Sequence, residues 1–231
     1  STLMRSSAAS DVYKRQVLSN IAFGLELQGV PKKERDQKAV ESVALVGLKG
    51  YENQKVSELS GGMQQRVGLA RAISNDPEVL LMDEAFSALD PLIRVQMQDE
   101  LLKLQEKMQK TIIFITHDLG VVAKVADYVN VMYAGKIVEK GTINEIFYDP
   151  KHPYTWGLLS AMPDLDTADE RLYTIPGSPP NLLNEKPGDA FAPRNQFALE
   201  IDDKADPPMF QVTDTHYAAT WLLDPRAPKA E

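Results

Sequence analysis

Apolar residues recur at helical spacing in the first third of the chain and again after residue 90. The segment PKKERDQKAVESVALVGL reads as a helix, and its proline suits a first helical turn. Its apolar stripe comprises Ala39, Val40, Val43 and Val46. A second helix is predicted after the Ser-Gly-Gly turn at residues 60–62, and a long amphipathic one from Pro91. The stripe of the long helix comprises Met97, Leu101, Leu104 and Met108.

Short apolar runs predict strands between and after these helices. The runs VLLM at residues 79–82 and TIIFI at residues 111–115 flank the long helix, which favours a right-handed crossover and a parallel sheet. Two later segments, VNVMYAG and KIVEKGT, alternate around a glycine turn and predict a hairpin. The pattern as a whole is typical of an α/β fold.

Changes in composition divide the chain into three parts. Residues 1–16 are polar, and their hexapeptide DVYKRQ resembles the translation of a transposon-end adaptor, so we expect this part to be non-native. Residues 17–147 form the predicted α/β domain, with a helical subdomain at about 17–75 and a strand-rich region at about 76–147. Residues 148–231 hold most of the prolines and predict an irregular extension.

Composition excludes several classes of site. The 231 residues contain no cysteine, which excludes disulfides and thiolate metal sites. A formal net charge of -8 disfavours a nucleic-acid surface, although helix ends and loops still bind phosphate with few lysines. The longest apolar runs are far shorter than the roughly 20 residues of a membrane span.

Two adjacent carboxylates, Asp83 and Glu84, follow the strand at residues 79–82. The carboxyl end of a parallel strand is where open α/β folds bind ligands. There one carboxylate can hold Mg²⁺ and the next can orient or deprotonate a water that attacks a γ-phosphate. Taken alone, the pair is equally compatible with a solvated strand end.

Three further segments carry candidate chemistry. In LSGGMQQR, Ser60, Gly61 and Gly62 precede a helix, so hydroxyl and backbone amides can face an anion, although a helix cap is the simpler interpretation. Asp90 ends SALD just before a helix, where it is again a candidate N-cap. His117 follows the strand TIIFI, and a single histidine there is more often structural than catalytic.

The order and spacing of these four segments resemble the ATP-binding-cassette (ABC) ATPases over about residues 17–142. Residues 59–64 match the signature motif, residues 79–83 the Walker B strand, residues 87–90 the D-loop, and His117 the switch histidine. The resemblance implies a partial P-loop NTPase core with a helical subdomain. It also implies a head-to-tail dimer, in which the phosphate loop of one subunit faces the signature motif of the other across ATP.

The resemblance also implies a role for each matching residue. Glu84 would be the general base, His117 a contact to the γ-phosphate, and Asp83 a ligand of Mg²⁺. The expected contacts to ATP are Ser60, Gly61, Gly62, Gln64 and Asp90.

One motif of this family does not occur in the sequence. No G-x-x-x-x-G-K-[ST] phosphate loop is present, and Gln16, near the position of the family's glutamine loop, lies in the adaptor-like part. We therefore expect a truncated chain that is inactive towards ATP on its own.

Different parts of the chain resemble two different subfamilies. The segments VLSNIAFGLELQGV and DEAFSALDPLIR resemble glycine betaine and proline importer ATPases, whereas FYDPKHPYTWGLLSAMPDLD and IPGSPPNLL resemble those of oligopeptide and dipeptide importers. The second subfamily usually has cysteines where this chain has Asp189, Asn195 and Asp202, so an iron–sulfur cluster is excluded. The change falls within TIIFITHDL, which predicts a chimera; a natural subunit of mixed character is the alternative.

The sequence thus predicts the ATP-hydrolysing subunit of an ABC importer, for oligopeptides or alternatively for glycine betaine. The implied partners are transmembrane permease subunits and a second ATPase subunit, at the cytoplasmic face of the membrane, with no nucleic acid. A rival interpretation is a non-hydrolysing chain that lends only its signature face. A cassette protein of DNA repair or translation is disfavoured by the acidic charge.

Overall fold

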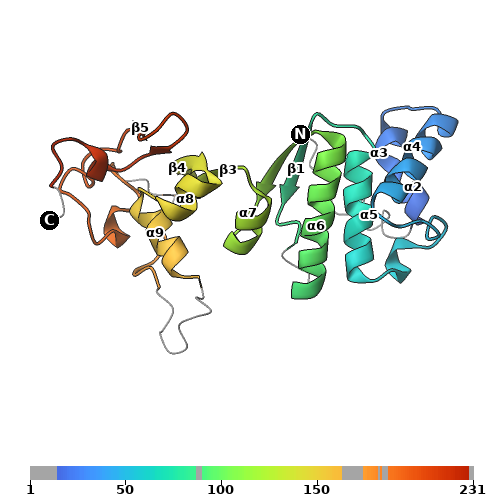
Figure 1. Ribbon diagram of the computed structural model, residues 1–231, viewed down its shortest axis with the longest axis horizontal. Coiled ribbons are helices and arrows are strands. Elements are labelled where there is room, and N and C mark those ends of the chain that lie inside the picture. The colour runs from blue at the N-terminus through green and yellow to red at the C-terminus, as the bar shows by residue number, and fades with distance from the viewer. Residues whose placement is uncertain (1–14, 87–89, 163–173, 182, 184–186, 229–231) are drawn as a thin grey trace. The chain divides into compact units, whose positions relative to one another are not determined.

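The computed structural model describes residues 15–86, 90–162, 174–181, 183 and 187–228 (Figure 1). The chain divides into two compact units, Ser1–Asp118 and Leu119–Glu231. No helix in the described ranges has the length and apolarity that a membrane crossing requires.

The first unit begins with a cluster of helices. Their bounds are α2 (Val17–Ile21), α3 (Phe23–Leu27), α4 (Lys32–Leu45), the 3-10 helix η1 (Val56–Glu58) and α5 (Gly61–Ile73). Helices α2, α4 and α5 contact one another, and apolar side chains fill the space between them. The predicted stripe of α4 is confirmed at Ala39, Val43 and Val46, each 0% exposed, but is wrong at Val40, which is 48% exposed.

Two residues of the predicted adaptor-like part contact this helical cluster. Gln16 forms an isolated β-bridge with Lys55 and directly precedes α2. Arg15 forms an ion pair with Glu26 at 3.0 Å, and its guanidinium lies 4.5 Å from the centre of the Phe23 ring. Residues 15 and 16 are therefore part of the fold that the structure describes.

The rest of the first unit is a parallel crossover. Strand β1 (Val79–Asp83) pairs with β2 (Thr111–Ile115) in parallel, and α6 (Pro91–Met108) connects them and runs alongside β1 and α5 (Figure 1). Side chains of α5, α6 and both strands line one small apolar cavity, and Met97, Leu101 and Leu104 of α6 are buried. The parallel pair and the stripe of α6 are thus confirmed, except at Met108, whose side chain lies outside the described atoms.

The opposite face of this two-stranded sheet is exposed. On this face, Val79 and Leu81 of β1 are 50% and 62% exposed, and Ile113 and Ile115 of β2 are 50% and 48% exposed. Because apolar strand faces and free strand edges promote association, we expect the chain to self-associate as its concentration rises.

Replacing Leu81 by lysine together with Ile113 by glutamate is expected to reduce this self-association. The two residues are cross-strand partners, so the new charges attract each other while they make the face polar. Light scattering over a concentration series measures the effect. Lysine at Leu92 and Val40, apolar helix residues that are 69% and 48% exposed, is the control and should change little. A parent chain that stays monomeric at all concentrations would contradict the expectation.

The second unit contains an antiparallel sheet that the tail completes. Its helices are α7 (Leu119–Val125), α8 (Ile143–Tyr148), α9 (Pro153–Ser160) and the 3-10 helices η2 (Ala192–Arg194) and η3 (Trp221–Leu223). Its strands are β3 (Tyr128–Tyr133), β4 (Lys136–Thr142), β5 (Phe210–Gln211) and β6 (Tyr217–Ala218), in the order β3-β4-β6-β5. The hairpin β3-β4 is as predicted. The tail is mostly irregular, but it adds two strands to that hairpin.

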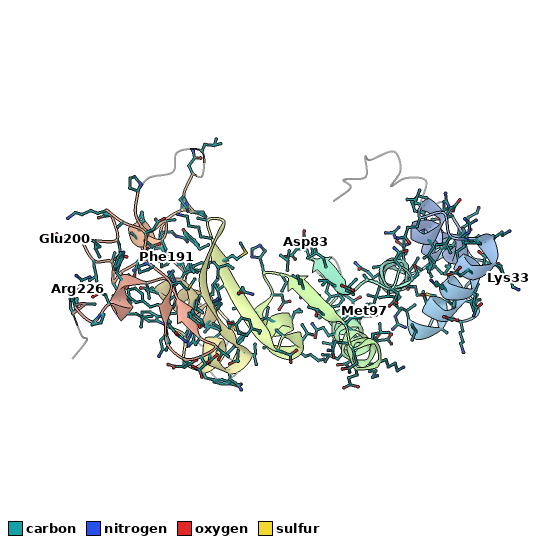
Figure 2. The ribbon with its side chains drawn as sticks, turned by 90° about the horizontal axis from the view of Figure 1, so that it is seen from above. Lys33, Asp83, Met97, Phe191, Glu200 and Arg226 are labelled. Carbon is teal, nitrogen blue, oxygen red and sulfur yellow. The ribbon has the colours of Figure 1, made fainter. Side chains whose placement is uncertain are left out.

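An aromatic core joins the tail to the hairpin. Tyr133 of β3 contacts Tyr154 of α9 and Phe191 of the tail, with ring centres 4.7 and 5.2 Å apart. Phe191 is 2% exposed and lies in one cluster with Val131, Val138 and Ile146 (Figure 2). The compact unit therefore starts at Leu119, whereas composition changes only after Phe147.

A buried carboxylate fixes the last strand of the tail. Glu139 of β4 is 0% exposed and accepts hydrogen bonds from the backbone amides of Lys151 and His152, at 2.6 and 3.1 Å. Its Oε1 also lies 2.8 Å from Nε2 of His216, which is equally buried. A Cβ at Gly141 would lie 3.2 Å from the His216 ring, so glycine leaves room for it.

His152 acts as a neutral cap in the same region. Its Nδ1 accepts a hydrogen bond from the backbone amide of Tyr154 at the start of α9, which places the ring proton on Nε2. Burial lowers the pKa of His152 to about 4. The ring is therefore neutral at physiological pH.

The three positions at which the resembled subfamily has cysteines bind backbone amides here. Oxygens of Asp189, Asn195 and Asp202 accept hydrogen bonds from the amides of Phe191, Phe197 and Leu199, at 2.9, 2.9 and 2.6 Å. Burial raises the pKa of both Asp189 and Asp202, since it disfavours their charged forms. Short-range hydrogen bonds thus shape this loop.

A second carboxylate, Glu145, joins α8 to the tail and gives a pH-dependent prediction. It accepts hydrogen bonds from Thr142, Thr213 and Thr215, and these lower its pKa from 4.5 to about 2, with the Thr213 hydroxyl as the largest cause. Because the folded pKa is the lower one, this contribution to stability is present above pH 4.5 and is lost as the pH falls towards 2.

Glutamine at position 145 is therefore expected to destabilise the second unit at pH 7 and to have no further effect near pH 2. Urea unfolding at both pH values, followed by the fluorescence of Trp156 and Trp221, measures the difference. Both tryptophans of the chain lie in the second unit. The exposed Glu200, replaced by glutamine, is the matched control. An equal loss at both pH values would contradict the assignment.

Candidate functional site

The end of β1 places Asp83 and Glu84 in different environments. Asp83 is the last strand residue, pairs with Ile115 in the register and is exposed. Glu84 has a φ of 48°, a left-handed conformation that is uncommon for a residue with a side chain, and its amide donates to the Ile115 carbonyl at 2.9 Å. A non-glycine residue in this region is a recognised feature of functional sites.

This conformation brings Glu84 to the turn after β2. Glu84 Oε1 accepts a hydrogen bond from the backbone amide of His117 at 3.2 Å. The next residue, Asp118, donates its amide to the Thr116 hydroxyl at 3.0 Å and forms an ion pair with Arg94 at 2.6 Å. The carboxylate of Glu84 and the backbone amide of His117 are thus brought together, just after two adjacent parallel strands.

The turn at residues 60–62 caps α5. The Ser60 hydroxyl accepts from the amide of Met63 at 3.4 Å, and the Gln64 side chain donates to the Leu59 carbonyl at 3.0 Å. Gly61 is exposed, with no heavy atom within 4 Å of where its Cβ would be. The simpler interpretation of Ser60, a helix cap, thus describes its local geometry. Gly61 remains open to a ligand.

Asp90 likewise caps α6, since its carboxylate accepts from the amide of Ile93 at 3.0 Å. The preceding D-loop residues, 87–89, lie outside the described residues. The first turns of the two capped helices meet, because a Cβ at Gly62 would lie only 2.9 Å from Cγ2 of Ile93. Gly62 therefore lies against the first turn of α6.

A cavity of about 200 Å³ runs along β1, and its lining includes the strand residues from Leu80 to Asp83. Its lining from α5 comprises Gln65, Gly68, Leu69 and Ala72. Its lining from β1, the following turn and α6 includes Asp83, Phe86 and Met97, of which Asp83 and Met97 are labelled in Figure 2. Most of its lining is apolar, and its polar side chains are those of Gln65 and Asp83.

The chemistry of Asp83 fits a magnesium ion only in part. An exposed carboxylate is a suitable hard ligand, and Mg²⁺ is often held by one or two carboxylates together with substrate phosphates and waters. Within the described ranges, no group of three or more histidine or acidic side chains is arranged to hold a metal. The remaining ligands of an ion at Asp83 would have to be phosphate oxygens and water.

Sequence patterns missed Arg94 and Asp118. Both lie next to predicted features, Arg94 in the first turn of the long helix and Asp118 directly after His117. Nothing in their spacing pairs them, since 24 positions separate them in the chain. The ion pair forms because the fold brings the turn after β2 next to the start of α6, and the sequence alone does not show this.

Two family models match different parts of the chain. The ABC transporter model matches residues 3–87, and the model of the oligopeptide/dipeptide transporter C-terminal region matches residues 138–201. The second match begins within β4, at Val138, and extends to Ile201 in the tail. The segments that form β5, β6 and η3 lie beyond it.

Curated relatives of both predicted kinds are found. The dipeptide transport ATP-binding protein DppD of Lactococcus lactis is 53% identical over 205 residues, which are 87% of this chain and 59% of the relative. The glycine betaine transport ATP-binding protein OpuAA of Bacillus subtilis is 61% identical over 140 residues, 61% of this chain and 34% of the relative. The chain thus spans less than two thirds of these relatives, and both predicted resemblances are confirmed.

A solved structure shares the fold. CbiO1 of Clostridium perfringens, described as part of the ABC transporter complex cbiONQ, superposes with a TM-score of 0.55 at 27% identity, over 59% of this chain and 55% of that one. This confirms the predicted ABC ATPase fold class. Together, the two matched regions and these relatives show that the chain contains an ABC transporter ATPase domain followed by an oligopeptide/dipeptide transporter C-terminal region.

Proposed function

We propose that the chain contributes catalytic and signature residues to the ATPase of an ABC importer for oligopeptides or dipeptides. The observation that carries this proposal is the contact between Glu84 and the His117 turn at the carboxyl end of β1. It holds a carboxylate beside a second strand end, which supports the assignment of Glu84 as the hydrolytic base. The identity to peptide transport ATP-binding proteins and the match at residues 138–201 support peptide as the cargo.

The chemistry assigned to these residues is proton removal from water. The Glu84 carboxylate accepts a proton as the water oxygen attacks the γ-phosphorus of ATP, and ADP leaves from the opposite side. His117 would contact the γ-phosphate, and Asp83 would hold a Mg²⁺ ion, which would neutralise phosphate charge. The nucleotide is also contacted from across a subunit interface, by Ser60, Gly61, Gly62, Gln64 and Asp90.

The proposed partners follow from the same arrangement. The phosphate loop that faces the Ser60 turn of this chain is expected to belong to another ATPase subunit. In a head-to-tail dimer, that subunit supplies the loop while this chain supplies the signature turn. Permease subunits would hold the dimer at the cytoplasmic face of the membrane.

A second candidate cargo is glycine betaine. The 61% identity to the glycine betaine transport protein OpuAA exceeds the 53% identity to DppD, although over fewer residues. Co-purification of this chain with a peptide permease or with a betaine permease distinguishes the two. We expect the peptide permease to retain it.

A mixed dimer tests the proposed function. This chain is combined with an intact ABC importer ATPase subunit whose own signature serine has been changed to arginine. ATP hydrolysis should return, because the partner's loop and Glu84 equivalent then meet the Ser60 turn of this chain. Rescue should survive Glu84→Gln in this chain and should be lost on Ser60→Arg. Absence of rescue, with association confirmed by sedimentation, would overturn the signature role of the Ser60 turn; the role of Glu84 is tested separately, in a fusion that restores the phosphate loop. This chain alone should show no activity.

A further inference from the structure

The first turn of α6 contacts both parts of the proposed site within the first unit. Ile93, in that turn, lies against Gly62 of the signature turn. Arg94, the next residue, forms its ion pair with Asp118, directly after His117. Asp90 fixes the start of the same turn, since its carboxylate caps the amide of Ile93 and its carbonyl accepts from the amide of Arg94.

We propose that Ile93 and Arg94 are positioning residues that hold the signature turn and the His117 turn in one fixed arrangement. The inference rests on the proposed function, since that function gives the two turns their roles. Neither residue has to touch nucleotide. Each acts through the backbone that carries Gly62 or His117.

The contact at Gly62 leaves no room for a side chain. A Cβ placed there would lie 2.9 Å from Cγ2 of Ile93, closer than real Cβ contacts, and 3.9 Å from Cδ1 of the same residue. Alanine at position 62 would push Ile93, and with it the first turn of α6. Gly61 is the natural comparison, because it starts the same helix and its Cβ would meet open space.

The contact at Arg94 fixes the other turn. Its guanidinium and the Asp118 carboxylate are both partly buried, with 29% and 37% of the side-chain surface exposed, so water screens the pair less than a fully exposed one. Asp118 also donates to Thr116, and the amide of His117 between them donates to Glu84. Residues 116–118 are thus held by Arg94 of α6, by Glu84 directly after β1, and by the hydrogen bond between Asp118 and Thr116.

Hydrogen exchange of the full chain, followed by mass spectrometry, tests the inference without nucleotide or turnover. Gly62→Ala should speed exchange in a peptide spanning residues 115–119 by about 3- to 10-fold, because displacement of α6 loosens its ion pair. Gly61→Ala should leave that peptide unchanged. Adding Ile93→Ala to Gly62→Ala should restore slow exchange, since it removes the clash.

Arg94→Gln provides the independent arm, because it needs no repacking at Gly62. It should speed exchange in the same peptide by about 3- to 10-fold, and Arg94→Lys should restore most of the protection. The pair Glu34 and Lys38 on α4, broken by Lys38→Gln, is the control. Unchanged exchange in both Gly62→Ala and Arg94→Gln would overturn the inference. So would faster exchange in Gly62→Ala that Ile93→Ala fails to reverse. None of these results depends on the mixed-dimer experiment.

Discussion

Replacing Glu84 by glutamine is expected to slow ATP hydrolysis about 10²- to 10⁴-fold, in a fusion that joins the phosphate-loop region of an ABC ATPase ahead of Val17. Glutamine has nearly the same shape, and its side-chain oxygen can still accept the hydrogen bond from the His117 amide. It lacks a carboxylate that takes up a proton. Nucleotide affinity should therefore change little while turnover falls.

Phosphate release measures the first quantity and calorimetry the second. Glu78 is a matched control, because it is an exposed glutamate just before the same strand, and glutamine there should leave hydrolysis unchanged. Turnover that is the same in Glu84→Gln and in the parent fusion would remove Glu84 from the role of general base. A loss of nucleotide binding equal to the loss of turnover would assign it to binding instead.

Replacing Glu139 by alanine is expected to destabilise the second unit by about 3–5 kcal/mol, the usual cost of removing one partner from a buried charged or strongly hydrogen-bonded pair. The two backbone amides and the His216 ring that surround the carboxylate would lose their acceptor in a site closed to water. Glutamine, which keeps one acceptor oxygen, should cost less than alanine.

Urea unfolding followed by tryptophan fluorescence is a selective measurement, because both tryptophans of the chain belong to the second unit. Glu200→Ala, which removes an exposed partner of Lys204, is the control and should cost no more than about 1 kcal/mol. A cost for Glu139→Ala as small as that of the control would mean that β6 is held by its backbone pairing and aromatic contacts alone.

Local patterns predicted the elements that position the site. The spacing of Met97, Leu101 and Leu104 identified the buried face of α6, and the two apolar runs beside it identified a parallel strand pair. Such patterns work because burial on one side of a helix or strand leaves a period in the sequence itself. Because these patterns located the elements, they also showed that the motifs around Ser60, Asp83 and His117 lie at element ends.

The first unit also shows where a local pattern is insufficient. Val40 fits the apolar period of α4 but is exposed, because the side of the helix that becomes buried depends on which neighbours pack against it. The left-handed conformation of Glu84 and the pairing of Arg94 with Asp118 likewise depend on how β2 and α6 lie beside β1.

The second unit separates most clearly what the sequence determined from what the tertiary structure decided. The sequence by itself determined the hairpin β3-β4, the absence of cysteine and the motif order of the proposed site. It left Glu139 as an ordinary charged residue of a hairpin strand. Only the tertiary structure buried it, because β6 adds to β4 and brings His216, 77 positions after Glu139, against it. Periodicity records which side of an element is apolar, whereas a long-range partner is chosen by packing across the whole unit, and no spacing within the strand encodes that choice.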